Sequence, residues 1–169
     1  MEEHDHEYRT GIGTDIHCVD ETCRLMLGGV YIPDADGLGG YSDGDVALHA
    51  VIDALLGASG MGDIGALFPD TDPKWEDADS KEFLFIVKGM LAEQRWLIVN
   101  VDLIIHAEEP YLGSVKPQIK RCIASLLGID FNAVNVKAKT NEGFGDIGAG
   151  EAIAATAIAL LKRKYKRIL

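Results

Sequence analysis

The sequence DVALHAVIDALLGASG at residues 45–60 has the spacing of apolar residues that is typical of a helix with one buried face. Gly60 follows the last apolar turn, so we expect this helix to span residues 45–59 and to end at that glycine. The residues before it have the pattern of strands. Residues 9–16 predict a first strand, and residues 25–32, with Gly28-Gly29 at the centre, predict a hairpin whose second arm ends at Pro33.

The rest of the chain continues this alternation of helices and strands. Helices are predicted at residues 80–94, 117–127 and 151–164, with Ser80 as the cap of the first, and strands at 96–107 and 134–140. Residues 34–44 and 141–150 are glycine-rich loops, and the long segment 63–79 is typical of a functional or mobile loop. These elements predict an α/β fold, a mixed β-sheet with helices packed on one face. The other face needs a cover, which we expect further copies of the chain to provide.

Length, charge and cysteine content narrow the classes of protein that fit. The chain has 169 residues and 16 Lys and Arg against 27 Asp and Glu, a formal charge of −11. This balance argues against nucleic-acid partners and anionic membranes, although a metal ion could still bring in a phosphorylated substrate. The three cysteines lack paired spacing, and the sequence has neither the pattern of a signal peptide nor an apolar run long enough to span a membrane. We therefore expect a cytoplasmic protein. We expect a flexible leader at residues 1–8 and a single domain at 9–169.

Two short motifs offer metal ligands. In Asp15-Ile16-His17 the period of a strand places the Asp and His side chains on the same face. Asp45, His49 and Asp53 recur every four residues along one helix face. One carboxylate and two imidazoles would suit a catalytic zinc with an open fourth position, and a neighbouring carboxylate such as Asp45 could orient a ligating histidine. Each motif alone also fits a simpler role, a turn-capping pair for Asp15 and His17 and a core histidine for His49. No dinucleotide, Walker or nucleophile-elbow motif is present.

The order of several longer blocks is more specific. The motif GTDIH at residues 13–17 is followed by YSDGDVALHA at 41–50, DALLGA at 53–58, GDIGALFPDTDP at 62–73 and VKAKTNE at 136–142. Together these blocks resemble the 2-C-methyl-D-erythritol 2,4-cyclodiphosphate synthase family over nearly the whole chain after residue 9. The resemblance implies an enzyme that converts 4-diphosphocytidyl-2-C-methyl-D-erythritol 2-phosphate into the cyclic diphosphate and CMP. It also implies a homotrimer whose sheets face the trimer axis, with three sites at subunit interfaces.

The resemblance further implies roles for individual residues. The metal ligands would be Asp15, His17 and His49 for zinc or another divalent cation, and Glu142 for a magnesium or manganese ion between the α- and β-phosphates. Catalytic residues would be Thr140, Glu142, Ser42 and Asp45. Substrate-binding residues would be Asp15, His17, Tyr41, Ser42, Asp63, Ile64, Gly65, Phe68, Asp70, Ala138 and Thr140.

The chemistry of the implied reaction fits this assignment. The 2-phosphate is already a nucleophile and CMP a competent leaving group, so the protein has mainly to align the substrate and neutralise its charge, which two cations would do. Two positions depart from the family pattern, Tyr41 where a phosphate-contacting His is common and Tyr111 where a Lys is usual. Two rival readings stay open: a homologue that binds the metal or nucleotide without turnover, and a hydrolase in which the metal activates water.

Overall fold

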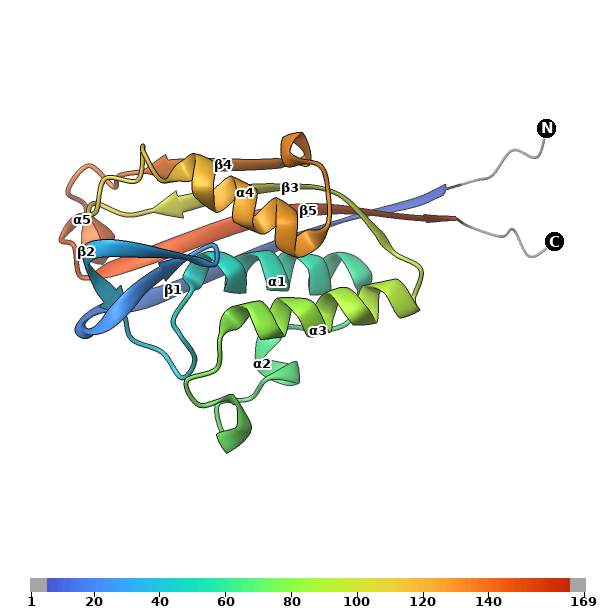
Figure 1. Ribbon diagram of the computed structural model, residues 1–169, viewed down its shortest axis with the longest axis horizontal. Helices are drawn as coiled ribbons and strands as arrows, with labels where there is room; N and C mark the ends of the chain where they lie inside the picture. Colours follow the sequence, from blue (N-terminus) through green and yellow to red (C-terminus); the bar gives the residue numbers. More distant parts are fainter. Residues whose placement is uncertain (1–5, 165–169) are drawn as a thin grey trace.

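The protein forms one five-stranded mixed sheet, seen in a computed structural model that describes residues 6–164 (Figure 1). The strand order is β2-β1-β5-β3-β4, and only β3 and β4 run parallel to each other. The bounds are β1 His6–Leu27, β2 Val30–Leu38, β3 Leu97–His106, β4 Val134–Lys139 and β5 Ala152–Lys164.

Three longer helices lie on one side of this sheet. They are α1 Val46–Ser59, α3 Ser80–Glu93 and α4 Lys116–Leu127. The connections contain two single-turn helices, α2 Ile64–Leu67 and α5 Gly145–Gly148. They also contain two 3-10 turns, η1 Pro73–Trp75 and η2 Phe131–Ala133. α1 packs on β1 and β5, α4 packs on β4, and α3 contacts both α1 and α4. The predicted fold class, a mixed sheet with helices on one face, is therefore confirmed. No helix within residues 6–164 has the length and apolar character needed to cross a membrane.

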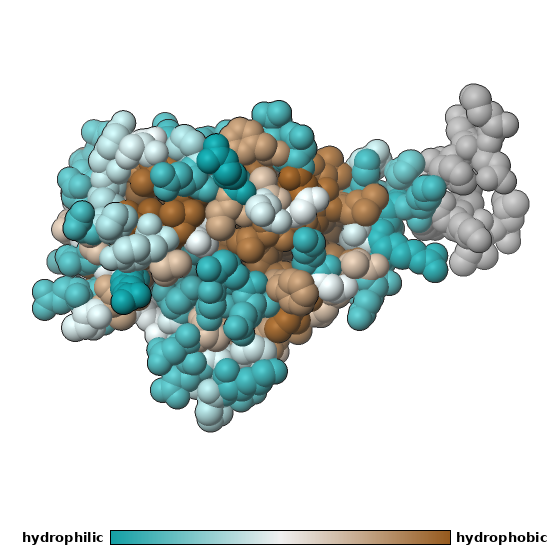
Figure 2. All heavy atoms as spheres, in the orientation of Figure 1, coloured by the Kyte–Doolittle hydropathy of each residue, from teal (hydrophilic) through white to brown (hydrophobic). Residues whose placement is uncertain are grey.

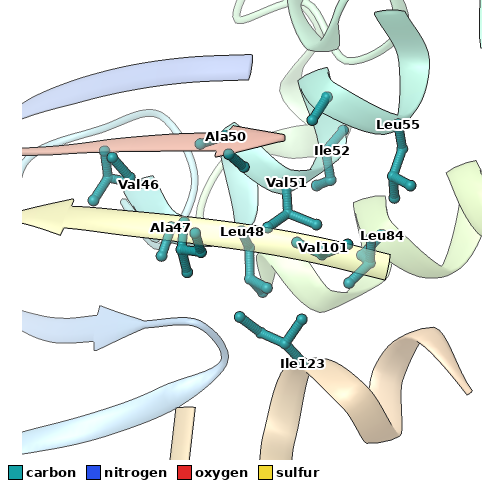
Figure 3. Packing of buried hydrophobic residues seen from close by; sticks show 14 of the residues in the cluster. Val46, Ala47, Leu48, Ala50, Val51, Ile52, Leu55, Leu84, Val101 and Ile123 are labelled. Atoms are coloured by element: carbon teal, nitrogen blue, oxygen red, sulfur yellow. The ribbon is translucent and has the colours of Figure 1, made fainter. Parts of the chain in front are cut away.

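The core lies between the helices and the sheet. Leu48 of α1, Leu84 of α3, Val101 of β3 and Ile123 of α4 are at most 1% exposed, and Figure 3 shows side chains from these four elements meeting there. Every second residue of β3 and β5 faces this core, as the period of a strand requires. A core of this size gives the chain its fold without help from a bound metal.

The glycines of the GIG sequence at residues 11–13 set the distance between α1 and β1. A Cβ atom on Gly11 would lie 2.1 Å from the carbonyl oxygen of Ala54, and one on Gly13 would lie 2.1 Å from that of Ala50. Such distances are too short for any side chain, so the helix backbone rests directly on the strand because both residues are glycine. This close packing brings His49, in the first turn of α1, next to β1.

The prediction of a C-terminal helix at residues 151–164 is wrong. This segment is β5, the central strand of the sheet, paired with β1 on one side and with β3 on the other. Its alanines and leucines favour a helix locally, but Ala155, Ala157 and Ala159 alternate with exposed or half-exposed residues and are buried against α1. Pairing on both edges and close packing under the helix override the local preference.

Smaller differences concern the N-terminal half. β1 starts at His6, inside the predicted leader, whose residues 1–5 lie outside the described part of the chain. The predicted hairpin turn at Gly28 and Gly29 is confirmed, since both residues have positive φ angles of 61° and 78°. Pro33 does not end the second arm, because β2 continues to Leu38. β2 is an edge strand, where a proline leaves no interior hydrogen bond unmade.

The face of the sheet away from the helices is apolar, and no part of residues 6–164 covers it. Ile12 and Ile158, which face each other across β1 and β5, are 64% and 48% exposed, and Tyr8 and Ile16 on β1 are 58% exposed. By contrast, the segment after α2 that projects below the helices in Figure 1 has a mainly hydrophilic surface in Figure 2. An uncovered apolar sheet face of this kind is typical of an interface with another chain.

Candidate active site

Three potential metal ligands converge where β1 passes the first turn of α1. The Oδ2 atom of Asp15 lies 2.9 Å from Nε2 of His17 and 2.9 Å from Nδ1 of His49. The two histidine nitrogens are 3.3 Å apart. These three residues are the Asp, His and His predicted from the sequence, and the close approach of α1 to β1 brings them together.

The donor set and its spacing fit a divalent cation. Zinc holds nitrogen and oxygen ligands at about 2.0–2.2 Å in a tetrahedron, which places those ligands about 3.3 Å from one another. The three separations in the chain are close to this value, and two imidazoles with one carboxylate form a set that zinc accepts. Three ligands leave a fourth position for a substrate oxygen. The simpler roles, a turn-capping pair and an isolated core histidine, do not account for this convergence.

Protonation within the triad follows from its geometry. Burial alone would raise the pKa of Asp15, but the close imidazole rings of His17 and His49 outweigh burial and hold this pKa well below its usual range. The hydrogen bond with Asp15 raises the pKa of His17, against the opposing effect of burial. Below the raised pKa of His17, a proton on its Nε2 competes with a cation for the position between Asp15 and His17.

The outward-facing ring nitrogens of both histidines have partners. Nδ1 of His17 donates to the carbonyl oxygen of Gly39 at 2.5 Å, which leaves Nε2 free to bind a cation. Nε2 of His49 lies 2.9 Å from the hydroxyl of Ser80 and 3.2 Å from that of Ser42. Each histidine thus turns a different nitrogen, Nε2 in His17 and Nδ1 in His49, toward the same point.

A cavity of 210 Å³ opens beside the triad. It is lined by nine of the predicted site residues together with Trp75 and Phe83; the nine are Asp15, His17, Tyr41, Ser42, His49, Ile64, Gly65, Phe68 and Asp70. A larger cavity of 470 Å³ lies elsewhere, between β2 and the loop after β3, but its lining contains no histidine and no predicted site residue. The chemistry therefore points to the smaller cavity.

Aromatic packing holds one wall of the cavity in place. Phe68 stacks on Phe83 of α3 with ring centroids 4.4 Å apart, and Trp75 meets both rings edge-on at 5.1 and 5.4 Å. The Tyr41 hydroxyl donates to the carbonyl oxygen of Asp72 at 3.2 Å. These contacts fasten the predicted loop at residues 63–79 over the site. Partial burial and nearby carboxylates raise the pKa of Tyr41, which keeps its phenol a neutral donor.

Asp63 lies just outside this lining and acts on the backbone. It caps α2, where its carboxylate accepts a hydrogen bond from the amide of Ala66 at 2.8 Å. Asp53 accepts from the amide of Ile64 at 2.8 Å and so attaches α2 to α1. Together the two carboxylates set the position of Ile64 and Gly65 at the rim of the cavity.

Three further predicted residues, Ala138, Thr140 and Glu142, lie at or beside a second cavity. Ala138 and Thr140, at the end of β4, line a cavity of 280 Å³ together with Tyr111. Glu142 lies next to it with a positive φ of 52°, and its carboxylate accepts a hydrogen bond from the Thr140 hydroxyl at 3.2 Å. The chain therefore presents the predicted site in two parts: the triad cavity on β1 and α1, and a second cavity beyond β3 and β4.

The predicted role of Asp45 beside the histidine ligands is wrong. Asp45 is fully buried at the N-terminus of α1, where its carboxylate accepts hydrogen bonds from the amides of Leu48, Gly28 and Gly29 at 3.0, 2.8 and 2.6 Å. Burial raises its pKa, although these backbone hydrogen bonds oppose the shift. Asp45 joins the β1–β2 turn to α1, a structural task that leaves its carboxylate no contact with the histidine rings.

Two residues near His49 were missed by the sequence analysis. Ser80, which is fully buried, was assigned as the cap of α3, but Asp79 caps that helix by accepting from the amide of Lys81 at 2.9 Å. The Ser80 hydroxyl instead joins Asp43 to His49. The only sequence signal was the position of Asp43 in the YSDGDVALHA block, and Ser80 is 37 residues further along the chain.

Comparison with known proteins agrees with this geometry. The YgbB family model matches residues 8–162. The 2-C-methyl-D-erythritol 2,4-cyclodiphosphate synthase of Treponema denticola is 48% identical over 153 residues, which cover 90% of this chain and 95% of that protein. The solved structure of the bifunctional IspDF from Campylobacter jejuni aligns with a TM-score of 0.90 and 40% identity, over 94% of this chain and 43% of that one.

A further solved structure, the CDP complex of IspF from Plasmodium falciparum, aligns with a TM-score of 0.81 and 36% identity, over 94% of this chain and 97% of that one. The similarity therefore extends over the whole fold and includes the strands and helices that carry both cavities. By sequence and by structure, this chain belongs to the YgbB family and is a relative of the 2-C-methyl-D-erythritol 2,4-cyclodiphosphate synthases.

Proposed function

We propose that this chain converts 4-diphosphocytidyl-2-C-methyl-D-erythritol 2-phosphate into 2-C-methyl-D-erythritol 2,4-cyclodiphosphate and CMP, a step of non-mevalonate isoprenoid precursor biosynthesis. The observation that carries the proposal is the triad of Asp15, His17 and His49 at the wall of a cavity lined by nine of the residues expected for this activity. Relatives that bear this enzyme name and match over 95% and 97% of their own length support it.

The triad would hold zinc or another divalent cation, and Glu142 would hold magnesium or manganese together with the substrate phosphates. When bound, these cations supply positive charge to the phosphoryl oxygens during in-line attack of the 2-phosphate on the β-phosphate. The chain needs this charge because its own formal charge is −11. The triad has the better geometric support of the two sites, because three of its ligand atoms lie within 4.8 Å of one another, whereas Glu142 offers a single carboxylate.

The side chains around the triad would position the substrate. Ser42 and Tyr41 line the cavity. The Ser42 hydroxyl can donate a hydrogen bond to a phosphate oxygen, and the Tyr41 hydroxyl can do so by exchanging its hydrogen bond to the Asp72 carbonyl. Phe68 and Asp70, from the segment over the site, would enclose the erythritol, and Asp63, Ile64 and Gly65 would contact the ribose. Closure by the aromatic wall would exclude water, which favours attack by the 2-phosphate over hydrolysis.

The second cavity would receive the cytidine end of the substrate. Ala138 and Thr140 line it, and Thr140 would also bind the α-phosphate. Because the two cavities are separate within one chain, we propose a homotrimer in which the second cavity of one copy faces the triad of the next. The uncovered apolar face of the sheet supports this assembly. We propose that the trimer acts in the cytoplasm, where the three cysteines would stay reduced.

One incubation tests the proposal. The purified protein is mixed with the diphosphocytidyl substrate, zinc and magnesium, and the products are separated by liquid chromatography and identified by mass. We expect CMP and the cyclic diphosphate in equal amounts. CMP with the uncyclised 2,4-bisphosphate would indicate a hydrolase, and unchanged substrate together with binding would indicate a homologue without turnover. His49→Ala is the inactive control, and His6→Ala, which changes an exposed histidine at the start of β1, is the matched active one.

A further inference from the structure

We propose that Asp43 and Ser80 fix the tautomer of the neutral His49 ring, so that its Nδ1 atom is the nitrogen that is free to bind a divalent cation. The inference rests on the metal site of the proposed function and adds two positioning residues to it. Neither residue lies among the three metal ligands, and both would act through His49.

A continuous chain of hydrogen bonds leads from Asp43 to His49. The Ser80 hydroxyl donates to the Asp43 carboxylate, whose second oxygen accepts from the Ser80 amide at 3.2 Å. The Ser80 Oγ atom lies 2.9 Å from Nε2 of His49. Ser80 is fully buried and His49 is 8% exposed, so this contact between their side chains is shielded from competing water.

The direction of this chain follows from what each group can donate. An ionised carboxylate only accepts hydrogen bonds, so the single hydroxyl proton of Ser80 is committed to Asp43. The Ser80 oxygen therefore faces His49 with a lone pair and must accept from it. Nε2 of neutral His49 then carries the ring proton, and Nδ1, which points toward Asp15 and His17, keeps the lone pair that a cation needs.

The same arrangement leaves Ser42 available. The Ser42 hydroxyl is also within reach of His49 Nε2, at 3.2 Å, and it lines the cavity. Because Ser80 is closer and can only accept, it takes the His49 proton, and the Ser42 hydroxyl can turn its own proton toward a phosphate oxygen. The pair of Asp43 and Ser80 would therefore serve both the metal ligand and the substrate contact beside it.

A purely structural role for Ser80 accounts for less of the geometry. Asp79 already caps α3, so the Ser80 hydroxyl is not needed there. The other metal-ligating histidine has the equivalent support from the backbone, since His17 Nδ1 donates to the Gly39 carbonyl. Both histidines thus have the nitrogen that faces away from the triad held by an acceptor, a backbone carbonyl for His17 and a serine oriented by a carboxylate for His49.

The first test measures affinity for Zn²⁺ alone, by competition with a fluorescent chelator. We expect Ser80→Ala and Asp43→Ala each to weaken Zn²⁺ binding by about 10–100-fold, the usual effect of removing a partner of a metal-ligating histidine. The double variant should lose little more than the weaker-binding single variant, since both act through one chain of hydrogen bonds. Asp43→Asn keeps a carbonyl acceptor and should lose less than Asp43→Ala.

Ser59→Ala is the matched control. It removes another buried serine hydroxyl, one that donates only to the carbonyls of Leu55 and Leu56 within α1, and its Zn²⁺ affinity should stay at the wild-type value. If Ser80→Ala and Asp43→Ala bind Zn²⁺ as tightly as Ser59→Ala, the inference is overturned. Circular dichroism establishes that each variant is folded.

The second test needs no variant to fold. In ¹⁵N-labelled, Zn²⁺-loaded wild-type protein, nuclear magnetic resonance should show a proton on Nε2 of His49 that exchanges slowly with water. A proton on Nδ1 would overturn the inference. If wild-type protein does not bind Zn²⁺, or if His49→Ala leaves the affinity unchanged, the metal site of the proposed function fails instead, so the two failures can be told apart.

Discussion

The Oδ2 atom of Asp15 lies 2.9 Å from the Nδ1 atom of His49, although 34 residues separate them in the sequence. The distance depends on the backbone of α1 resting on β1 at Gly13, whose missing Cβ would lie 2.1 Å from the carbonyl oxygen of Ala50. The spacing of the metal ligands is therefore set by helix–sheet packing at Gly13 and Ala50, which lie within two residues of the ligands. A change at this glycine should affect stability and metal binding together.

Gly13→Ala should test this coupling. The added methyl group forces α1 away from β1, and overpacking of this kind costs about 1–3 kcal/mol of unfolding free energy. We also expect weaker Zn²⁺ binding, because His49 moves with the helix. Gly89→Ala is the matched control: Gly89 lies in α3, and outside the backbone of that helix no described atom lies within 4 Å of an added Cβ, so the change should stabilise the protein by about 0.5–1 kcal/mol. Urea unfolding at one protein concentration measures both, and equal stabilities would contradict the packing argument.

His17→Ala and His49→Ala should each abolish tight Zn²⁺ binding and turnover while leaving the fold intact. Each removes one of three ligands, whereas the apolar core lies between the helices and the sheet and does not depend on a metal. Metal analysis after dialysis, with circular dichroism on the same samples, measures the two effects. His6→Ala should retain the metal. Full Zn²⁺ occupancy in both site variants would remove the triad as the metal site.

The affinity for Zn²⁺ should fall as the pH is lowered, and the fall should begin above the usual range of an imidazole. The hydrogen bond with Asp15 raises the pKa of His17, so below that pKa a proton competes with the cation for Nε2. In the metal-free protein the contribution of His17 to the free energy of unfolding changes with pH in the opposite direction to the Zn²⁺ affinity. The ion pair of protonated His17 with Asp15 stabilises the fold most below the ordinary histidine pKa. This contribution is lost as the pH rises through the raised pKa of His17. Zn²⁺ titrations and unfolding of the metal-free protein at several pH values check both signs, and an affinity that does not change with pH would contradict the first.

The metal triad could be predicted from the sequence because its parts are local motifs. Asp15 and His17 share a face by the period of a strand, and His49 lies near the start of a strongly apolar helix that is buried on almost every side. The pairing of these two motifs came from their resemblance to a family, since no local rule places them together. Asp43 and Ser80 were missed for the same reason: they meet only through the tertiary fold, across 37 residues.

Local preference also explains two of the errors. Residues 151–164 are rich in Ala and Leu, and their place as the central strand depends on β1 and β3, which lie far away in the sequence. Asp45 shares a helix face with His49 by spacing, but it stands at the N-terminus of α1, where exposed backbone amides attract its carboxylate. In both cases a backbone hydrogen-bond requirement outweighed a pattern of side chains.

The trimer can be tested at Ile158, at the centre of the uncovered sheet face. Ile158 faces Ile12 across β5 and β1, and both are about half exposed or more in the single chain. Ile158→Lys would place a charge in a buried interface, where an unpaired charge is strongly unfavourable. Light scattering should therefore show trimers for the wild-type protein and smaller species for Ile158→Lys, with the secondary structure unchanged. Phe85→Lys is the matched control, because Phe85 is 78% exposed on the outer side of α3 and should leave the trimer intact.

Turnover should follow assembly in the same variants. Within one chain the triad lines one cavity, and Ala138 and Thr140 line another, so a separated chain lacks a complete site for the two ends of the substrate. Ile158→Lys should consequently lose turnover but keep its Zn²⁺ affinity, since Asp15, His17 and His49 all come from one chain. An Ile158→Lys protein that is monomeric and fully active would show that a single chain completes the site, and it would contradict the proposed trimer as the active form.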